Sequence, residues 1–242
     1  MSLGKVEALW ARSVYSPVPV RNAFEVTVER LAQSIRLGVL VGGERLPPER
    51  ELAETLGVSR VTLREAIGAL RSAGLIESRR GRGGGTFVVA PRASRPRPGG
   101  RRRPSAADLE DMLDFRRIVE PGAAALAATR TLTATDRATL QRFLRESTTC
   151  SAGRRRLADS RLHMAIAAAS ESPSVVGVVG DVQLKLTEAL RRIPVIPANI
   201  QHSDRQHAAV VAAILEGEPE VARSTMEEHI DASAALLRGL LG

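Results

Sequence analysis

The chain has 242 residues, a formal net charge of +8, one cysteine and only 2% aromatic residues. A single cysteine excludes an intrachain disulfide and favours a reducing compartment, and no apolar run approaches the roughly 20 residues that a membrane helix needs. The N-terminus also lacks the basic-then-apolar layout of a secretion signal. We therefore expect a cytoplasmic protein without membrane contact, and its richness in Ala and Leu favours helices.

The positive charge lies in the first part of the chain. Residues 1–104 contain 19 Lys and Arg against 9 Asp and Glu, whereas residues 105–242 contain 16 against 18. This asymmetry predicts a polyanionic partner, such as nucleic acid, for the first part only. The alternative is an arginine-rich composition without any such partner.

Residues 1–19 are weakly patterned, and we expect them to form an extended arm. Apolar residues then recur at helical spacing between Phe24 and Leu40, and glycines follow. This segment is the expected first helix of a domain over residues 20–90.

The next stretch has the pattern of two short amphipathic helices joined by a tight turn. The apolar residues from Glu49 to Leu56 share one helix face, and Gly57 is suited to ending that helix. Ser59 is suited to capping a second helix, which Gly74 ends. Helix, glycine turn and helix together predict a helix-turn-helix, whose second helix lies in the DNA major groove.

Two short β-prone runs, Leu75–Ser78 and Thr86–Val89, flank the basic glycine-rich tip RRGRGGG. They predict a β-hairpin, and a helix-turn-helix followed by a hairpin is a winged helix. The polar residues early in the second helix and the arginines of the tip are the candidates for DNA contact. They are Ser59, Arg60, Thr62, Arg64, Arg80 and Arg82.

The run from Leu46 to Val88 resembles the DNA-binding domain of GntR-family bacterial transcription regulators. The pieces that carry this resemblance are Leu46-Pro47, Glu49-Arg50, Gly57-Val58-Ser59-Arg60, Leu63-Arg64-Glu65-Ala66 and Gly74-Leu75. The resemblance implies that Arg50, Arg60 and Arg64 contact operator DNA. It also implies that the wing glycines, Gly83 among them, approach the minor groove. Val61 departs from the family, which often has Thr or another small residue there.

Proline, glycine and arginine dominate residues 91–104, which we expect to be a linker. From Ser105, which is suited to capping a helix, the sequence keeps a helical period to residue 241. The breakers predict six helices, at about 106–128, 134–148, 154–170, 174–193, 203–216 and 219–240. The expected fold is therefore mainly α, with an N-terminal winged helix-turn-helix and an all-α bundle over residues 105–242.

Four polar residues lie on otherwise apolar faces of these predicted helices. Asp159 and His163 are four residues apart and share a helix face. His207 and His229 lie at nearly the same height on the last two helices, which only a short turn connects. A carboxylate and three imidazoles that converge suit a transition metal, most simply Zn²⁺, with Ni²⁺ or Mn²⁺ as alternatives. Ordinary core or surface histidines are the competing interpretation.

The helical part resembles the effector-binding domain called FCD, found in the FadR subgroup of the GntR family. The resemblance rests on residues 115–121, 126–128, 159–163, 207–214 with Gly217, and 226–229. It implies that Asp159, His163, His207 and His229 bind a metal, and that Arg116 points into the same cavity. A metal with an open position beside an arginine is suited to a small carboxylate effector.

The sequence thus predicts a homodimeric transcription regulator, most simply a repressor, that binds a near-palindromic double-stranded operator and responds to a small carboxylate. A metal-dependent hydrolase or lyase is one alternative. Against it, the two acidic residues that we considered as general bases, Glu171 and Asp204, are expected in turns. A second alternative is an architectural DNA-binding protein that needs neither cavity nor metal.

Overall fold

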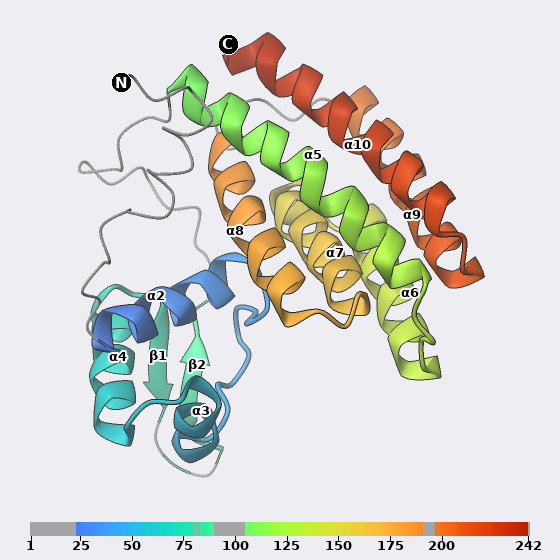
Figure 1. The fold of residues 1–242 in the computed structure, drawn as a ribbon. Coiled ribbons are helices and arrows are strands. Elements are labelled where there is room, and N and C mark those ends of the chain that lie inside the picture. Colours follow the sequence, from blue (N-terminus) through green and yellow to red (C-terminus); the bar gives the residue numbers. More distant parts are fainter. Residues whose placement is uncertain (1–22, 80, 82, 90–104, 191–196, 242) are drawn as a thin grey trace, which may run out of the picture.

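The computed structural model describes residues 23–79, 81, 83–89, 105–190 and 197–241. It has two parts, a small winged head that ends at residue 89 and a helical bundle that begins at residue 105 (Figure 1). The predicted fold class, a mainly helical chain with an N-terminal winged helix-turn-helix and a C-terminal all-α bundle, is confirmed. The predicted arm over residues 1–19 and the predicted linker over residues 91–104 lie outside the described residues.

The described part of the head contains three helices and a hairpin. They are α2 (Ala23–Arg36), α3 (Glu49–Leu56), α4 (Arg60–Ser72), β1 (Ile76–Arg79) and β2 (Gly85–Val88). Helix α2 ends four residues before the expected Leu40. Gly38 follows it with φ of 71°, a left-handed backbone conformation that stops a helix and favours glycine.

The turn between α3 and α4 is built as the sequence predicts. Gly57 takes a left-handed conformation after α3, and its backbone N–H bonds to the end of that helix. The Ser59 hydroxyl caps α4 by accepting the Thr62 backbone N–H at 3.0 Å. Leu63, at 0% exposure, anchors the apolar face of α4 in the core of the head. Packing of the apolar faces of α3 and α4 in this core therefore holds the opposite face of α4 toward solvent.

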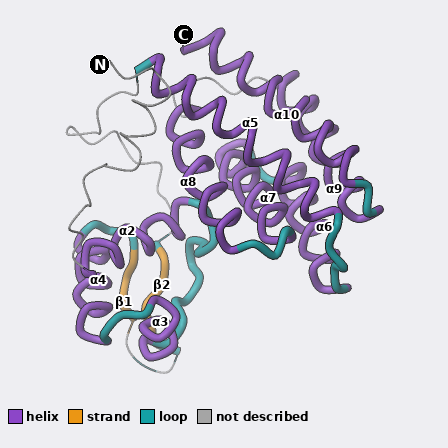
Figure 2. Tube along the Cα trace, in the orientation of Figure 1, coloured by secondary structure: helices purple, strands orange, loops and turns teal. Residues whose placement is uncertain are grey.

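The wing is an antiparallel pair in which Ile76 lies opposite Val88 and Arg79 opposite Gly85. At its tip, Gly81 and Gly83 have φ of 94° and 91°, which the permissive glycine backbone allows. In the described residues these are the only two strands, as the colours of Figure 2 show. Ile76 and Val88 pack into the same core as α4, so that the wing is fixed beside the helix-turn-helix.

The described part of the bundle contains the six predicted helices and one short 3-10 turn. They are α5 (Ala106–Ala128), α6 (Ala134–Thr149), η1 (Ala152–Arg154), α7 (Arg155–Ala169), α8 (Pro173–Leu190), α9 (Pro197–Glu216) and α10 (Pro219–Leu241). The largest departure is α9, which begins at Pro197 rather than near 203. Proline is tolerated in the first turn of a helix, so Pro197 begins α9 instead of separating it from α8.

Helix α7 occupies the middle of the bundle, and α5 packs along both α8 and α10 (Figure 1). Small alanines such as Ala124 and Ala127, both at 0% exposure, allow α5 to pack closely against its neighbours. Helices α5 and α6 each start with a capping box, formed by Ser105 with Asp108 and by Thr133 with Asp136. Within the described residues, no helix combines the length and the apolar character needed to span a bilayer.

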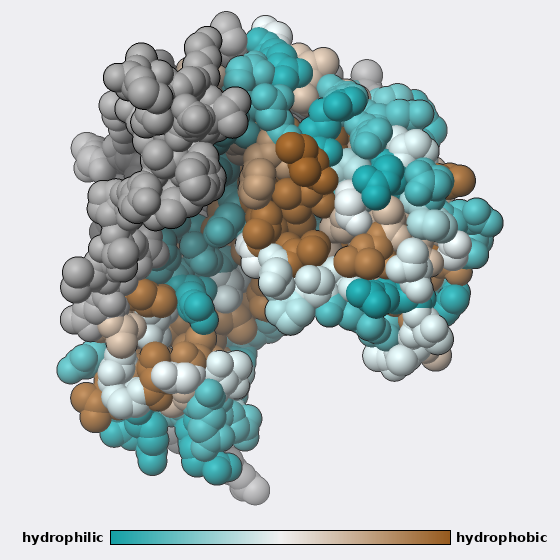
Figure 3. Space-filling model, viewed as in Figure 1, coloured by the Kyte–Doolittle hydropathy of each residue, from teal (hydrophilic) through white to brown (hydrophobic). Residues whose placement is uncertain are grey.

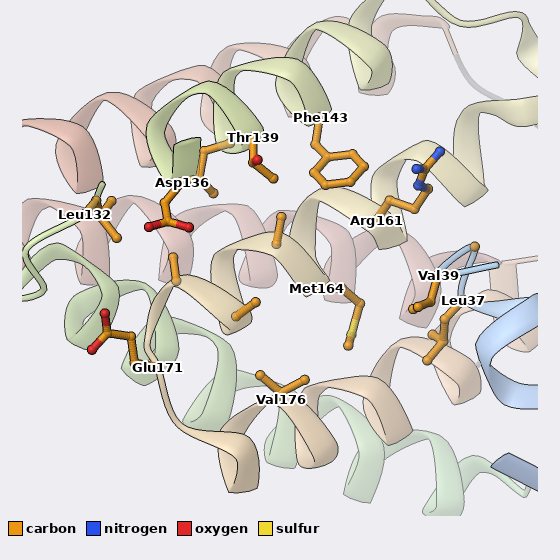
Figure 4. Close-up of a pocket in the computed structure, with 15 residues that line it drawn as sticks. Leu37, Val39, Leu132, Asp136, Thr139, Phe143, Arg161, Met164, Glu171 and Val176 are labelled. Atoms are coloured by element: carbon orange, nitrogen blue, oxygen red, sulfur yellow. The ribbon is translucent and has the colours of Figure 1, made fainter. Parts of the chain in front are cut away.

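The head and the bundle meet where the loop after α2 contacts α7. A Cβ atom added to Gly38 would lie 2.6 Å from Leu157 Cδ1, so glycine is required for contact as well as for φ. Beside this junction is a cavity of about 430 Å³ lined by the loop and by α6, α7 and α8. Figure 4 shows Leu37, Val39, Met164 and Arg161 at one end of this cavity.

Candidate functional site

Three histidine side chains meet in the interior of the bundle. His163 on α7, His207 on α9 and His229 on α10 are 1%, 1% and 4% exposed. The Nε2 atom of His207 lies 3.2 Å from Nε2 of His163 and 3.2 Å from Nε2 of His229. The predicted convergence of these three imidazoles is therefore confirmed, and the turn between α9 and α10 places His207 and His229 side by side.

Asp159 lies one helical turn before His163 on α7. Its Oδ1 atom is 3.6 Å from His207 Nε2, and its side chain is 25% exposed. It is thus the one member of the predicted metal-binding set that reaches solvent. The three imidazoles form the closed side of the cluster, and Asp159 borders its open side.

A fifth polar residue, Glu120 on α5, completes the surroundings of the cluster, and the sequence analysis did not assign it a role. Its Oε2 atom contacts His163 Nδ1, and its Oε1 atom accepts hydrogen bonds from Arg116 Nε and Gln183 Nε2, both at 2.9 Å. The side chain is 2% exposed. Arg116 and Glu120 are opposite charges one helical turn apart in an alanine-rich helix, which is the only sequence signal for this network.

Arg116 lies beside the cluster, as expected, but part of its guanidinium is already hydrogen-bonded within the protein. It is 1% exposed, and it donates to Glu120 through Nε and to Ser233 through Nη1 at 2.6 Å. A guanidinium has five N–H donors, so these two bonds leave others for a ligand. The bonds to the protein also hold the group in one orientation.

The buried charges set the protonation states of the cluster. Burial lowers the pKa of His207 to about 4, although the Asp159 carboxylate opposes this shift. Burial and the neighbouring imidazoles also hold the pKa of His229 well below its ordinary value. Burial would raise the pKa of Glu120, but Arg116 and His163 lower it to about 2. His207 and His229 are therefore neutral near pH 7, which is the form that binds metal.

The hydrogen-bonding pattern fits a cation at the centre of the three rings. The Glu120 carboxylate only accepts, so a neutral His163 carries its proton on Nδ1 and presents a lone pair at Nε2. His229 Nδ1 lies 3.3 Å from the Gln206 side-chain oxygen, which assigns its proton in the same way. His207 Nδ1 has no hydrogen-bond partner among the described residues. When the three rings are neutral, only His207 can carry its proton on Nε2, so at least two of the three Nε2 lone pairs face one another without a donor of their own. A cation bound between the rings would interact favourably with these lone pairs.

The spacing of the donor atoms agrees with this fit. Four ligands at about 2.0–2.1 Å around a tetrahedral zinc ion lie roughly 3.3 Å from one another. Two of the Nε2 separations are 3.2 Å, and the ligand atoms of all three imidazoles lie within 4.8 Å of one another. The three histidines could therefore hold an ion, whereas Asp159, 3.6 Å from His207 Nε2 but outside this group, would have to turn toward the ion to become the fourth ligand.

The cluster opens on one side to a cavity of about 120 Å³. Its lining includes Arg116, Arg155, Asp159, His229 and Ser233. This volume holds several water molecules or a small organic molecule, and it lies well below the size of ordinary drug-binding pockets. The cavity thus joins the candidate metal ligands to a buried arginine.

The expected position of one acidic residue was wrong. Asp204 lies within α9 rather than in a turn, because α9 begins early, and it pairs with Arg155 at 2.8 Å. Glu171 does lie in a turn, with φ of 58°. Glu120 is closest to the cluster, but it contacts the Nδ1 side of His163, away from the Nε2 centre. Asp204 lines the same cavity as Asp159 and His229, where Arg155 holds its carboxylate in an ion pair.

The second candidate surface lies on the outer face of α4. Arg60 and Arg64 are both exposed and lie one helical turn apart. Arg64 Nε donates to Glu49 Oε2 at 2.7 Å, so this side chain is already tied to α3. Arg60 has no ion-pair partner within the described part of the chain. Val61 is 67% exposed between them.

The remaining DNA-contact candidates differ in their surroundings. Arg50 is exposed and lies 3.7 Å from Glu54. The Ser59 hydroxyl caps α4 and also lies 2.8 Å from the Thr62 hydroxyl, so both hydroxyls are engaged within the protein. Gly83 lies at the wing tip. The last two candidates, Arg80 and Arg82, lie outside the described residues.

Comparisons with known proteins agree with both parts. The family described as "Bacterial regulatory proteins, gntR family" matches residues 23–88, and the "FCD domain" matches residues 111–232. The chain is 34% identical over 229 residues to RmpR of Mycobacterium gastri, described as an HTH-type transcriptional regulator, covering 90% of this chain and 81% of that protein. It is 30% identical over 231 residues to the Glc operon transcriptional activator of Escherichia coli (strain K12), covering 87% of each.

A solved structure, E. coli McbR/YncC, has a TM-score of 0.56 at 20% identity, covering 92% of this chain and 100% of that chain. This likeness supports the fold alone. The relatives named above are transcription regulators rather than enzymes. The winged head, the helical bundle and these matches together show that the chain belongs to the GntR family of bacterial DNA-binding transcription regulators, in the FadR subgroup that carries an FCD domain.

Proposed function

We propose that this regulator is a cytoplasmic homodimeric repressor that binds a near-palindromic operator and releases it when a small carboxylate occupies the bundle. The effector is held at a divalent transition metal, most simply Zn²⁺, and at Arg116. The single observation that carries the proposal is the meeting of three buried Nε2 atoms beside a cavity that also contains an arginine.

The residues divide into three groups by role. His163, His207, His229 and Asp159 hold the ion, which supplies a Lewis-acidic position for a carboxylate oxygen when bound. Arg116, already oriented by Glu120 and Ser233, donates its remaining N–H groups to the same carboxylate. The cavity of about 120 Å³ limits the effector to an acid of a few heavy atoms.

DNA recognition uses the exposed arginines of the head. Arg60 and Arg64 face the major groove, while Arg50 and the wing positions Arg80, Arg82 and Gly83 contact phosphates or the minor groove. The Ser59 and Thr62 hydroxyls, which are bonded to each other, shape the start of α4 and approach the phosphates there. Pairing of two copies presents two heads to two half-sites.

The pairing surface that we propose is the outer face of α5 and its neighbour α8. Phe115 is 43% exposed and Ile118 is 73% exposed on α5, which is unusual for large apolar side chains on one helix. Figure 3 shows hydrophobic residues gathered on this side of the bundle. Replacing Ile118 by Asp should convert the dimer to a monomer in sedimentation or light scattering. A dimer that persists unchanged would place the interface elsewhere.

The sense of regulation is part of the proposal. Release of a repressor by its effector is the simplest use of a cavity that reaches Arg155 and Asp159 on α7, the helix whose Leu157 and Arg161 also contact the head. One relative, the Glc operon activator, acts in the opposite sense. Transcription from the chain's own operator with and without effector distinguishes the two.

The proposal is tested by selecting preferred duplexes from a random pool with the full chain, then measuring affinity at fixed salt. Metal-free protein, Zn²⁺-loaded protein, and loaded protein with a panel of two- to four-carbon acids are compared. One acid should change the affinity about 5- to 150-fold, and His207→Ala should bind the duplex but lose this response. Absence of duplex preference, or no response to any acid, would contradict the proposal.

A further inference from the structure

Glu120 is the point at which the candidate metal site and the candidate effector arginine meet. Its two carboxylate oxygens reach partners on three helices, namely Arg116 on α5, His163 on α7 and Gln183 on α8. Arg116, Glu120, His163 and Gln183 are each at most 2% exposed. This network is therefore buried, its orientation is set by the protein, and Arg116 is the member that borders the cavity.

The two oxygens have different tasks. Oε1 accepts from the Arg116 Nε–H and the Gln183 amide, both at 2.9 Å, and so fixes the plane of the guanidinium. Oε2 contacts only His163 among the described residues. A carboxylate that only accepts places the proton of a neutral His163 on Nδ1, which leaves the Nε2 lone pair facing His207 Nε2 at 3.2 Å.

We propose that Glu120 is a positioning residue shared by His163 and Arg116. It selects the His163 tautomer that presents Nε2 to the metal, and it holds Arg116 at the edge of the effector cavity. The inference rests on the proposed metal site, and it adds the residue that makes this site and the carboxylate receptor one unit. Carboxylates that accept from metal-bound histidines typically raise metal affinity about 10- to 100-fold.

A buried ion pair alone would not need this arrangement. Arg116 and Glu120 lie one turn apart on one helix, so Oε1 by itself would satisfy their pairing. The second oxygen is instead directed to a histidine on another helix, within a side chain that is 2% exposed. An ion pair with only a structural role would not account for the contact between Glu120 Oε2 and His163.

The test uses the full chain with both members of the pair replaced, so that no buried charge is left alone. The variant is Glu120→Met/Arg116→Met. Its matched control is Glu110→Met/Arg238→Met, which removes an exposed pair between α5 and α10 with the same substitutions. A third variant, Glu120→Gln/Arg116→Met, restores an oxygen that can accept from His163 Nδ1.

Two readouts are needed. The chain has four histidines, so ¹⁵N-histidine labelling gives a simple spectrum from which the His163 tautomer is read in metal-free protein. Competition with a chromophoric chelator gives the Zn²⁺ affinity. The wild type and the control should show the Nδ1–H tautomer and equal affinity. The Met/Met variant should lose that tautomer and bind Zn²⁺ about 10- to 100-fold more weakly, with partial recovery in the Gln variant.

The outcomes separate this inference from the proposed function. If the wild type binds Zn²⁺ and the Met/Met variant binds it within two-fold, the role of Glu120 is overturned while the metal site stands. If the wild type carries the His163 proton on Nε2, the role of Glu120 is overturned whatever the metal result. If the wild type binds no Zn²⁺, the proposed metal site fails, and the contribution of Glu120 to metal affinity fails with it.

Discussion

The head and the bundle use polar residues in opposite ways. Among the described residues of the head, one polar side chain, Thr27, is buried, and the arginines lie on the outside. The bundle buries an arginine, a glutamate, a glutamine and three histidines near one another. Solvated charges cost little to keep and remain available to a polyanion. Buried polar groups are costly unless they are paired, so their presence in the bundle marks the place where ligand chemistry is expected.

The largest loss of stability should come from removing one member of the buried ion pair between Arg116 and Glu120. Arg116→Met leaves the Glu120 carboxylate buried without its arginine partner, and it should lower the free energy of unfolding by about 3–5 kcal/mol. Arg117→Met is the matched control, since the neighbouring arginine pairs with Asp231 at the surface. Urea denaturation of both variants measures the difference. Equal stabilities would show that burial does not distinguish the two pairs.

The junction between the two parts offers the next test. Gly38→Ala and Gly43→Ala both place a side chain at positive φ, but only the Gly38 Cβ would meet Leu157 and Arg161 on α7. Gly38→Ala should therefore be less stable than Gly43→Ala by about 1–3 kcal/mol, the usual cost of overpacking. Thermal unfolding compares them. If the two variants unfold alike, the contact between the loop and α7 contributes little.

The arginines of the head should affect DNA binding and leave the bundle intact. Arg64→Ala should weaken binding to the selected duplex by about 1–3 kcal/mol and relax its sequence preference, as expected for a base contact. Arg71→Ala, at the other end of α4, should have a smaller effect. Binding titrations at several salt concentrations measure both. A loss of metal content in Arg64→Ala would contradict the separation of roles.

The smallest effect is expected from an exposed ion pair. The side chains of Arg50 and Glu54 are 72% and 66% exposed and lie 3.7 Å apart. Glu54→Gln should change the free energy of unfolding by less than about 0.5 kcal/mol. The same variant removes a negative charge near Arg50, so it should strengthen duplex binding slightly at low salt. A large loss of stability in Glu54→Gln would show that this exposed pair contributes more to the free energy of unfolding than exposed ion pairs usually do.

Much of the fold could be predicted from local pattern. Gly57 and Ser59 marked the turn and the cap of the helix-turn-helix, because the left-handed conformation and the capping bond each favour one residue type. His207 and His229 could be paired from their distances to a short turn. Pro197 misled the prediction of α9, since proline both interrupts a helix and begins one.

The network around the candidate metal site was harder to predict. Glu120 and Gln183 lie on α5 and α8, and nothing in their spacing relates them to the histidines. Which faces of these helices turn inward depends on packing between elements that are far apart in the chain. The same holds for the pair of Arg64 and Glu49, whose residues lie on two helices. Local periodicity therefore placed the candidate ligands on helix faces, whereas the contacts of Glu120 and Gln183 depend on tertiary packing.

The central claim is that the buried imidazoles hold a metal ion. The most direct measurement is native mass spectrometry, with elemental analysis, of freshly purified wild type and of His207→Ala. The account predicts a wild-type dimer with one divalent transition metal ion per chain, and a folded His207→Ala protein from which the metal is lost. A wild type without metal, or a His207→Ala protein with the same metal content, would contradict it.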